Sequence, residues 1–197
     1  MTAQAPALVL ASTSPYRREL LERLRLPFRA VAPVCDETPG EDEAPAATAL
    51  RLSALKARSL QSAFPDALII GSDQVASCDG RRLGKPGSHE NAVRQLRLLS
   101  GKAADFNTAV SLLDARSGEL QSRVVPCRVL FRALDERRIE AYLRREQPYD
   151  CAASAKAEGL GIALIARMET DDPTSLIGLP LIALTDMLER AGLSPLH

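Results

Sequence analysis

Six charged side chains, four cationic and two acidic, are of the types that hydrolysis of a phosphoanhydride requires. They are Arg17, Arg18, Lys56, Lys85, Glu37 and Asp73. The reaction depends mostly on placing positive charge around phosphate oxygens and a divalent cation, while a carboxylate orients or deprotonates the attacking water. The sequence contains neither G-x-x-x-x-G-K-[ST] nor G-x-G-x-x-G, and no nucleophilic triad is in view. These residues therefore indicate phosphoanhydride chemistry outside the ordinary P-loop enzymes.

Arg17 and Arg18 lie in the first turn of a helix that the sequence predicts directly after a short buried strand. The apolar run Leu8 to Ala11 is typical of a strand buried on both faces. Ser14 suits the N-cap of the following helix, and Pro15 suits its first position. Because the positive end of a helix dipole repels cations, an anion is expected beside the two arginines.

Backbone N–H groups and hydroxyls at the same turn would complete a phosphate site. The hydroxyls belong to Ser12, Thr13 and Ser14. Together with two guanidinium groups they are strong partners for phosphate oxygens. The alternative is an ion pair between Arg18 and Glu22 one turn on, with Arg17 solvated. That pair has the weaker orientation on a helix, which favours the phosphate hypothesis.

Asp73 follows a second apolar run, Ala67 to Ile70, which turn-forming residues are expected to end. A carboxylate there occupies the edge at which open α/β sheets bind ligands, and an aspartate in an Asx-turn is the alternative. The dipeptide Asp79-Gly80 predicts a hairpin turn that brings Lys85 back toward Asp73. A lysine that is only solvated is the alternative at that position.

Two further elements bear on the position of these residues. A helix is predicted over residues 46–63, with Lys56 on the side that it shares with Leu52 and Ser53. Its apolar face is formed by Leu50, Ala54, Ala57 and Leu60. Residues 160–168 are expected to form a strand. Alternating strands with a short turn between them predict an antiparallel second half, so the pattern is mixed α/β.

Charge and composition exclude several classes of function. The 197 residues include 25 basic and 25 acidic side chains, so there is no global positive field to hold a nucleic acid. The first residues lack the features of a signal peptide, and no apolar run approaches the length of a membrane span. We expect a soluble cytoplasmic protein that binds neither membranes nor nucleic acid.

The cysteines and histidines are too scattered to predict a zinc or redox centre. The cysteines are Cys35, Cys78, Cys127 and Cys151, and they form no C-x-x-C motif. We therefore expect reduced thiols. A cysteine nucleophile assisted by His89 is the remaining alternative, but no activating pattern surrounds any of the four thiols.

Together, the motifs resemble those of the Maf-like nucleotide pyrophosphatases and, within that family, of the branch that acts on 7-methyl-GTP. They run along nearly the whole chain as L-V-L-A-S-T-S-P-Y-R-R, D-E-T-P, R-L-S-A-L-K-A, I-I-G-S-D-Q-V, D-G-x-x-x-G-K-P, D-C-A-A-S-A-K-A-E-G and G-L-P-L. The resemblance implies an α/β fold of the Maf/inosine-triphosphatase type. Its mixed elongated central sheet is flanked by helices and forms two lobes with a cleft, in a single domain over residues 1–197. A homodimer is a further expectation.

The activity that this resemblance implies is hydrolysis of 7-methyl-GTP between its α- and β-phosphates, which yields 7-methyl-GMP and pyrophosphate. The expected cofactor is a divalent cation, Mg²⁺ or Mn²⁺, and the expected role is removal of modified nucleotides from the pool. Two alternatives remain: a dTTP- or UTP-type pyrophosphatase of the same family, and a non-catalytic, nucleotide-sensing regulator of cell division. A pure sensor needs no carboxylate to activate water, so Asp73 argues against the second.

The resemblance also implies roles for individual residues. Asp73 matches the proton acceptor and, together with Glu37, the metal-binding position. Phosphate contacts are implied for Ser12, Arg17, Arg18, Lys56 and Lys85. Base preference is implied for Tyr16, Gln74 and Glu158. An N7-methyl purine is positively charged, so an aromatic face at Tyr16 and a carboxylate at Glu158 would favour it, while Gln74 would hydrogen-bond a base edge.

Four positions depart from the family pattern. Tyr16 stands where tryptophan is expected, Ala109 and Ala153 where glycine is expected, and Thr174 where asparagine is expected before the G-L-P motif. Tyrosine keeps a smaller aromatic face, so the change bears on base affinity rather than on catalysis. Alanine in place of glycine predicts slightly altered loops, whereas the sequence does not predict what threonine at position 174 changes.

Overall fold

The computed structural model describes residues 6–196, which divide into two units. The first unit takes residues 6–74, 108–125 and 172–196, and the second takes residues 75–107 and 126–171. The expectation about a signal peptide falls mainly on residues 1–5 and lies outside the described residues. No helix within residues 6–196 is long and apolar enough to cross a membrane.

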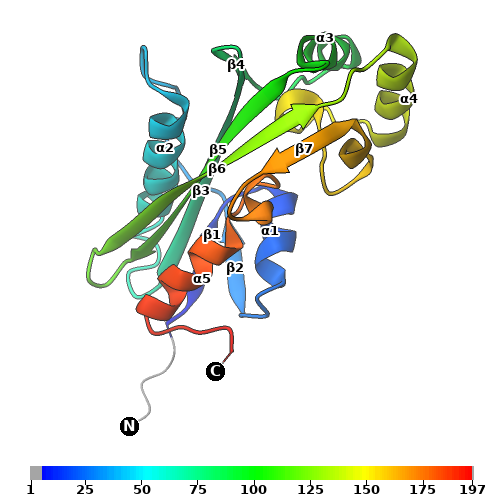
Figure 1. Ribbon diagram of the computed structural model, residues 1–197. Helices are drawn as coiled ribbons and strands as arrows, with labels where there is room; N and C mark the ends of the chain where they lie inside the picture. The colour runs from blue at the N-terminus through cyan, green and yellow to red at the C-terminus, as the bar shows by residue number, and fades with distance from the viewer. Residues whose placement is uncertain (1–5, 197) are drawn as a thin grey trace. The chain divides into compact units, whose positions relative to one another are not determined.

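Seven strands of the described chain pair into one mixed sheet (Figure 1). They are β1 (Leu8–Ala11), β2 (Phe28–Val31), β3 (Leu68–Cys78), β4 (Arg81–Leu83), β5 (Ala103–Asp114), β6 (Leu120–Phe131) and β7 (Ile165–Glu169). The strand order is β2-β1-β3-β5-β6-β7, with β4 paired to β3. Strand β1 is parallel to β2 and β3, whereas β4 is antiparallel to β3 and β7 to β6. The predicted mixed α/β class is confirmed.

In the first unit, helices cover both faces of the sheet. Its helices are α1 (Pro15–Glu22), α2 (Pro45–Ser59) and α5 (Leu181–Arg190). Leu8 and Leu10 of β1 belong to the apolar cluster that contains the buried leucines of α1 and α5. Val9 belongs to a second cluster, with Ala57 of α2. Because side chains alternate along a strand, α1 and α5 lie on one face and α2 on the other (Figure 1).

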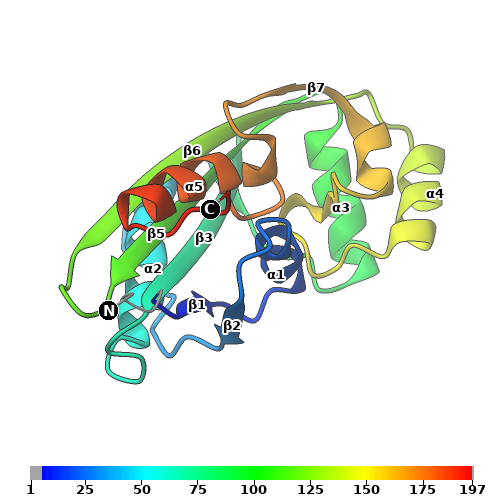
Figure 2. The ribbon, with the colours of Figure 1, turned by 90° about the horizontal axis from the view of Figure 1, so that it is seen from below.

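In the second unit, α3 (His89–Leu99) and α4 (Glu136–Glu146) pack against each other, as Figures 1 and 2 show. Leu96 of α3 and Tyr142 of α4 are among the buried residues of these helices. The turn between β3 and β4 has positive φ at both Asp79 and Gly80, 49° and 76°. These angles and the antiparallel pairing confirm the predicted hairpin.

The position of Asp73 in the sheet differs from the sequence prediction. Strand β3 does not end at Ile70 but continues to Cys78, so Asp73 lies within a strand and the Asx-turn alternative is wrong. Ser72 and Asp73 do not break the strand because both find hydrogen-bond partners inside the protein.

Two further predictions of local structure need correction. The buried face of α2 carries Leu52 and Lys56, while Leu50 is 38% exposed. The cause is a close backbone contact between α2 and β3, described below. Residues 160–164 form a 3-10 helix rather than a strand, because Gly161 N turns back to donate to the carbonyl oxygen of Lys156.

The four cysteines are free thiols, as expected. Burial raises the pKa of Cys127 to about 11, so this thiol stays protonated. The His89 ring lies 3.0 Å from the Tyr149 hydroxyl and 3.2 Å from Glu140 Oε1. Its partners are therefore a phenol and a carboxylate, which gives the cysteine-nucleophile alternative no support.

Candidate active site

Lys56, Asp73 and Glu37 form a charged cluster in the first unit, here called the Lys56 cluster. Lys56 Nζ lies 2.7 Å from Asp73 Oδ1 and 2.7 Å from Glu37 Oε2. Lys56 and Asp73 are 5% and 8% exposed, whereas the Glu37 side chain is 54% exposed. One buried ammonium thus joins a buried carboxylate and an accessible one, in a place where charge interactions are stronger than in bulk water.

Gly71 explains why Lys56 reaches Asp73. A Cβ atom at Gly71 would lie 2.0 Å from the carbonyl oxygen of Ser53 and 2.8 Å from the amide nitrogen of Ala57, both in α2. Only a residue without a side chain lets α2 approach β3 this closely. Lys56 follows Ser53 by about one helical turn, and Asp73 shares a strand face with Gly71, so the contact brings the two charges together.

Arg51 of α2 holds the segment that carries Glu37. Its Nη2 donates to the Thr38 carbonyl oxygen at 3.1 Å, and its Nε donates to Glu43 Oε1 at 2.7 Å. The hydrogen bond from Arg51, followed by that from the Gly40 N–H, lowers the pKa of Glu43 to about 2. The Glu37 segment is therefore tied to the same helix that presents Lys56.

The start of α1 has the predicted geometry. Ser14 is the N-cap, its Oγ accepts from Arg17 N at 3.4 Å, and Pro15 is the first helical residue. Ser12 is buried, and its Oγ accepts from Ser14 N at 3.1 Å. This turn places N–H groups, a hydroxyl and Arg17 at the positive end of the helix, which is the arrangement that the anion-site hypothesis requires.

Arg17 and Arg18 have different environments. Arg17 Nε donates to the Gly178 carbonyl oxygen at 2.8 Å, so four of its five N–H donors, on the two Nη atoms, remain for a ligand. Burial lowers the pKa of Arg17, and the carboxylates of the Lys56 cluster oppose that shift. Arg18 instead forms an exposed pair with Glu22 at 3.2 Å, the alternative considered above. Its phosphate role stays a prediction.

Gln74 contacts a loop of the first unit, residues 172–178, here called the anchor loop. Its Nε2 lies 3.0 Å from the carbonyl oxygens of Ser175 and Leu176 and 2.9 Å from Thr108 Oγ1. Ser72 Oγ lies 2.9 Å from the Gly178 carbonyl oxygen. The amide nitrogen of Gln74 is therefore used within the protein, and its carbonyl oxygen is the atom left for a base edge.

Sequence reasoning missed the residues that surround Gln74. Ser72 and Thr108 are fully buried, and the buried Asp172 begins the anchor loop. A signal existed for the first two, because a hydroxyl on an otherwise apolar strand needs a buried partner. The anchor loop itself had no signal, since the carbonyl oxygens that it presents belong to the backbone.

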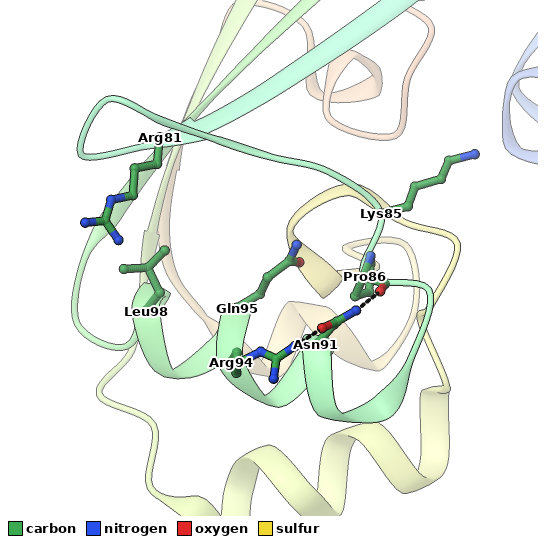
Figure 3. Close-up of a pocket in the computed structure, with 7 residues that line it drawn as sticks. All are labelled: Arg81, Lys85, Pro86, Asn91, Arg94, Gln95 and Leu98. Carbon is green, nitrogen blue, oxygen red and sulfur yellow. Dashed lines mark hydrogen bonds between the residues drawn. The ribbon is translucent and has the colours of Figure 1, made fainter.

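Lys85 lines a hollow of about 420 Å³ in the second unit (Figure 3). The other lining residues are Arg81, Pro86, Asn91, Arg94, Gln95 and Leu98. The Lys85 side chain extends away from Arg81, so these charged ends do not converge on one ligand. Gln95 Nε2 donates to the Gly84 carbonyl oxygen at 2.9 Å and fixes the turn before Lys85. The approach of Lys85 to Asp73, which belongs to the other unit, stays a prediction.

Glu158 is exposed on a loop of the second unit, residues 151–161, here called the Glu158 loop. Glu146, the last residue of α4, fixes this loop. Its Oε2 accepts from Leu160 N at 2.8 Å, and its Oε1 lies 3.3 Å from Lys156 Nζ. Lys156 N in turn donates to the Tyr142 hydroxyl at 3.1 Å. The backbone on both sides of Glu158 is therefore anchored to α4.

Three departures from the family pattern have physical explanations. Ala153 adopts φ 59°, a left-handed conformation that glycine enters at lower cost. Ala109 lies inside strand β5 rather than in a loop, and its φ is not positive, so the backbone there accepts a side chain. Thr174 Oγ1 donates to Asp172 and accepts from Leu181 N, and an asparagine side chain can likewise both donate and accept.

Glu37 and Asp73 have the chemistry of a Mg²⁺-binding pair. Within residues 6–196, no group of three or more His, Cys, Asp and Glu side chains could hold a metal ion alone. Mg²⁺ does not need such a group, because one or two carboxylates together with water and substrate phosphates commonly bind it. Glu37 and Asp73, which both pair with Lys56, supply two carboxylates and so meet that requirement.

Comparisons with known proteins match nearly the whole chain. Residues 7–191 match a family model described as Maf-like protein. A protein of Cupriavidus pinatubonensis is 59% identical, over 95% of this chain and 94% of its own length. A protein of Thiobacillus denitrificans is 58% identical over 100% and 98%, and one of Methylobacillus flagellatus is 58% identical over 95% and 97%. All three are named 7-methyl-GTP pyrophosphatase.

Proposed function

The chain belongs to the Maf-like protein family, and on that premise we propose that it hydrolyses 7-methyl-GTP to 7-methyl-GMP and pyrophosphate. Relatives with 58–59% identity bear the name of this activity. The structural observation that carries the proposal is the Lys56 cluster, in which Lys56 Nζ lies 2.7 Å from both carboxylates. Such an enzyme removes methylated nucleotides from the pool.

Asp73 is the proton acceptor in this proposal. Its Oδ1 accepts from Lys56 Nζ, and its Oδ2 has no hydrogen-bond partner in the described residues. Oδ2 therefore takes a proton from the water that attacks the anhydride between the α- and β-phosphates. The Lys56 ammonium keeps the carboxylate oriented, so the base is in place before the nucleotide arrives.

In this proposal the cations bind the phosphates and the two carboxylates bind the metal ion. Arg17 offers its two Nη groups to phosphate oxygens, while Ser12, Arg18, Lys56 and Lys85 complete the phosphate-binding set. Glu37 and Asp73 would hold Mg²⁺ or Mn²⁺, which would supply positive charge against the charge that develops on the phosphate oxygens. In the free enzyme Lys56 offsets one of the two negative charges of these carboxylates.

Three residues set the preference for the methylated base. The N7-methyl group gives guanine a positive charge, so the ring of Tyr16 attracts it by a cation–π interaction and the carboxylate of Glu158 attracts it directly. Gln74 presents its carbonyl oxygen, since its amide nitrogen is bonded within the protein. A carbonyl acceptor suits the N1–H and amino donors of guanine.

A panel of 7-methyl-GTP, GTP, dTTP and UTP, each with Mg²⁺ or Mn²⁺, tests the activity. We expect pyrophosphate release to be fastest with 7-methyl-GTP, and Asp73→Asn to lower kcat about a hundred- to ten-thousandfold. Asp79→Asn is the matched control, since Asp79 is an exposed partner of Lys102 in the hairpin turn. Preference for dTTP or UTP would contradict the substrate assignment, and tight binding without turnover would contradict catalysis.

Glu158→Ala tests charge recognition of the base. We expect kcat/KM for 7-methyl-GTP to fall about threefold to thirtyfold while that for GTP changes less, because only the methylated base is positively charged. The measured quantity is the ratio of the two kcat/KM values. An equal loss for both substrates would show that Glu158 does not recognise the charge.

A further inference from the structure

The anchor loop gathers side chains from several elements of the first unit onto its backbone oxygens. The Gly178 oxygen accepts from Arg17 Nε of α1 at 2.8 Å and lies 2.9 Å from Ser72 Oγ of β3. The Ser175 oxygen accepts from Thr108 Oγ1 of β5 at 2.8 Å and lies 3.0 Å from Gln74 Nε2. The orientation of both Arg17 and Gln74 therefore depends on where this loop lies.

Asp172 and Thr174 fix the anchor loop to the start of α5. Asp172 is 2% exposed, and its Oδ1 accepts from Thr174 N at 3.0 Å and from Thr174 Oγ1 at 2.6 Å. Its Oδ2 accepts from Ile182 N at 2.8 Å, and Thr174 Oγ1 accepts from Leu181 N at 2.8 Å. The two side chains thus receive the first N–H groups of a helix whose N-cap, Pro180, provides no side-chain bond.

The helix dipole stabilises this arrangement. The negative charge of Asp172 lies at the positive end of α5, where the N–H groups of the first turn have no partner in the helix. The carboxylate accepts three hydrogen bonds there, so moving it would leave buried donors unsatisfied. The anchor loop consequently has one strongly favoured position.

We propose that Asp172 and Thr174 are positioning residues of the active site, which act on the phosphates through the Gly178 oxygen and Arg17. By holding the Gly178 oxygen against Arg17 Nε, they aim the two Nη groups of Arg17 at the phosphate oxygens. The phosphate role of Arg17 rests on the proposed function, whereas the mechanical link from Thr174 to Arg17 does not. The same loop holds Gln74 Nε2 and so turns its carbonyl oxygen toward the base.

The first experiment measures the link without any substrate. In protein labelled with ¹⁵N-arginine, the Arg17 Nε–H signal is identified by its loss in Arg17→Lys and reports the bond to the Gly178 oxygen. We expect Thr174→Val to shift this signal to that of a solvated arginine and to remove its protection from exchange. Thr174→Ser and Thr174→Asn keep a donor and an acceptor, so both retain the signal.

Asp135→Asn is the matched control for Asp172→Asn. Asp135 is the N-cap of α4 in the second unit and accepts from Arg138 N at 2.8 Å, so the variant removes a carboxylate charge from the start of a helix that does not belong to the unit of Arg17. We expect Asp172→Asn to shift the Arg17 signal and Asp135→Asn to leave it unchanged. If Asp172→Asn does not fold, Thr174→Val alone decides, and an unchanged Arg17 signal in that variant overturns the proposal.

The second experiment is a double-mutant cycle in the pyrophosphatase assay. Thr174→Val lowers kcat/KM about tenfold in the wild-type background, because small displacements of a positioning group are costly. In the Arg17→Ala background the same substitution lowers it less than about twofold, since the group through which it acts is gone. An equal factor in both backgrounds indicates a general structural role and overturns the proposal. If the wild-type protein does not hydrolyse 7-methyl-GTP, the proposed function is contradicted. The arginine signal still tests whether Thr174 positions Arg17, because that measurement needs no substrate.

Discussion

The two units hold their functional charges in opposite ways. In the first unit, Lys56 and Asp73 are 5% and 8% exposed and lie 2.7 Å apart. In the second, Lys85 and Glu158 are both exposed. In the first unit, burial fixes the charges before a ligand binds. In the second, the charges are exposed, and only the backbone of the turn or loop that carries them is fixed by hydrogen bonds.

This difference matches the tasks that the proposed function gives to the Lys56 cluster and to Glu158. Chemistry at a phosphoanhydride benefits from charges that need no reorganisation during the reaction, which burial and short pairs provide. Recognition of a base needs only one well-placed charge at the end of a fixed loop. The carboxylates that fix the anchor loop and the Glu158 loop also differ. Asp172 lies at the start of α5, where the helix dipole favours a negative charge. Glu146 is the last residue of α4, where the dipole disfavours a negative charge, and it is paired with Lys156.

The largest effect is expected when the buried pair of the first unit, Lys56 and Asp73, loses its cation. Lys56→Met leaves the Asp73 carboxylate buried without its cation. We expect kcat/KM to fall at least about a hundredfold, and the free energy of unfolding to fall by about 3 kcal/mol in urea denaturation. The control is Arg97→Met in the second unit, where Arg97 pairs with Glu136 at 2.7 Å and both side chains are more than half exposed. A similar loss of stability in both variants would contradict the comparison.

Gly71→Ala breaks the same cluster through the backbone. The new Cβ would lie 2.0 Å from the Ser53 carbonyl oxygen, so α2 must move away from β3 and carry Lys56 with it. We expect a loss of about 2–3 kcal/mol in the free energy of unfolding and a lower kcat at temperatures where the protein stays folded. Gly84→Ala is the control, because a Cβ at Gly84 meets nothing within 4 Å. Unchanged stability in Gly71→Ala would show that α2 adjusts freely.

Much of the fold could be predicted from local patterns. The short strand before Ser14, the N-cap and proline at α1, and the hairpin at Asp79-Gly80 all follow from residue types that favour one conformation. The chemical types of the site residues could also be predicted from the sequence. Cations in the first turn of a helix and a carboxylate after an apolar strand both indicate a charged ligand or partner.

What sequence reasoning could not provide was long-range contact. The buried face of α2 and the extension of β3 beyond Ile70 both depend on tertiary partners. The link from Thr174 to Arg17 passes through a backbone oxygen, which every residue carries. The cofactor, the homodimer and the roles of all the site residues stay predictions.

Gly161→Ala tests the second region at the backbone that supports Glu158. The new Cβ would lie 2.5 Å from the Lys156 carbonyl oxygen, so the Glu158 loop must shift. We expect the preference for 7-methyl-GTP over GTP to fall about threefold to tenfold, with kcat nearly unchanged because the Lys56 cluster is untouched. Gly118→Ala controls for general strain, since it adds a methyl group at φ +77° with nothing within 4 Å. A large loss of kcat with an unchanged preference would contradict the division of tasks.

The smallest effect concerns Arg18, a charge of the first unit that is exposed. Its ion pair with Glu22 is solvent-exposed, with side chains 65% and 56% exposed, so a phosphate can replace the carboxylate at little cost in free energy. Glu22→Gln removes the competitor, and we expect KM for 7-methyl-GTP to fall about twofold with kcat unchanged. Glu19→Gln makes the same charge change on the exposed side of α1 and should leave KM higher than in Glu22→Gln. Equal KM values in the two variants would mean that the pair does not compete with phosphate, and Arg18 would then belong to the solvated surface.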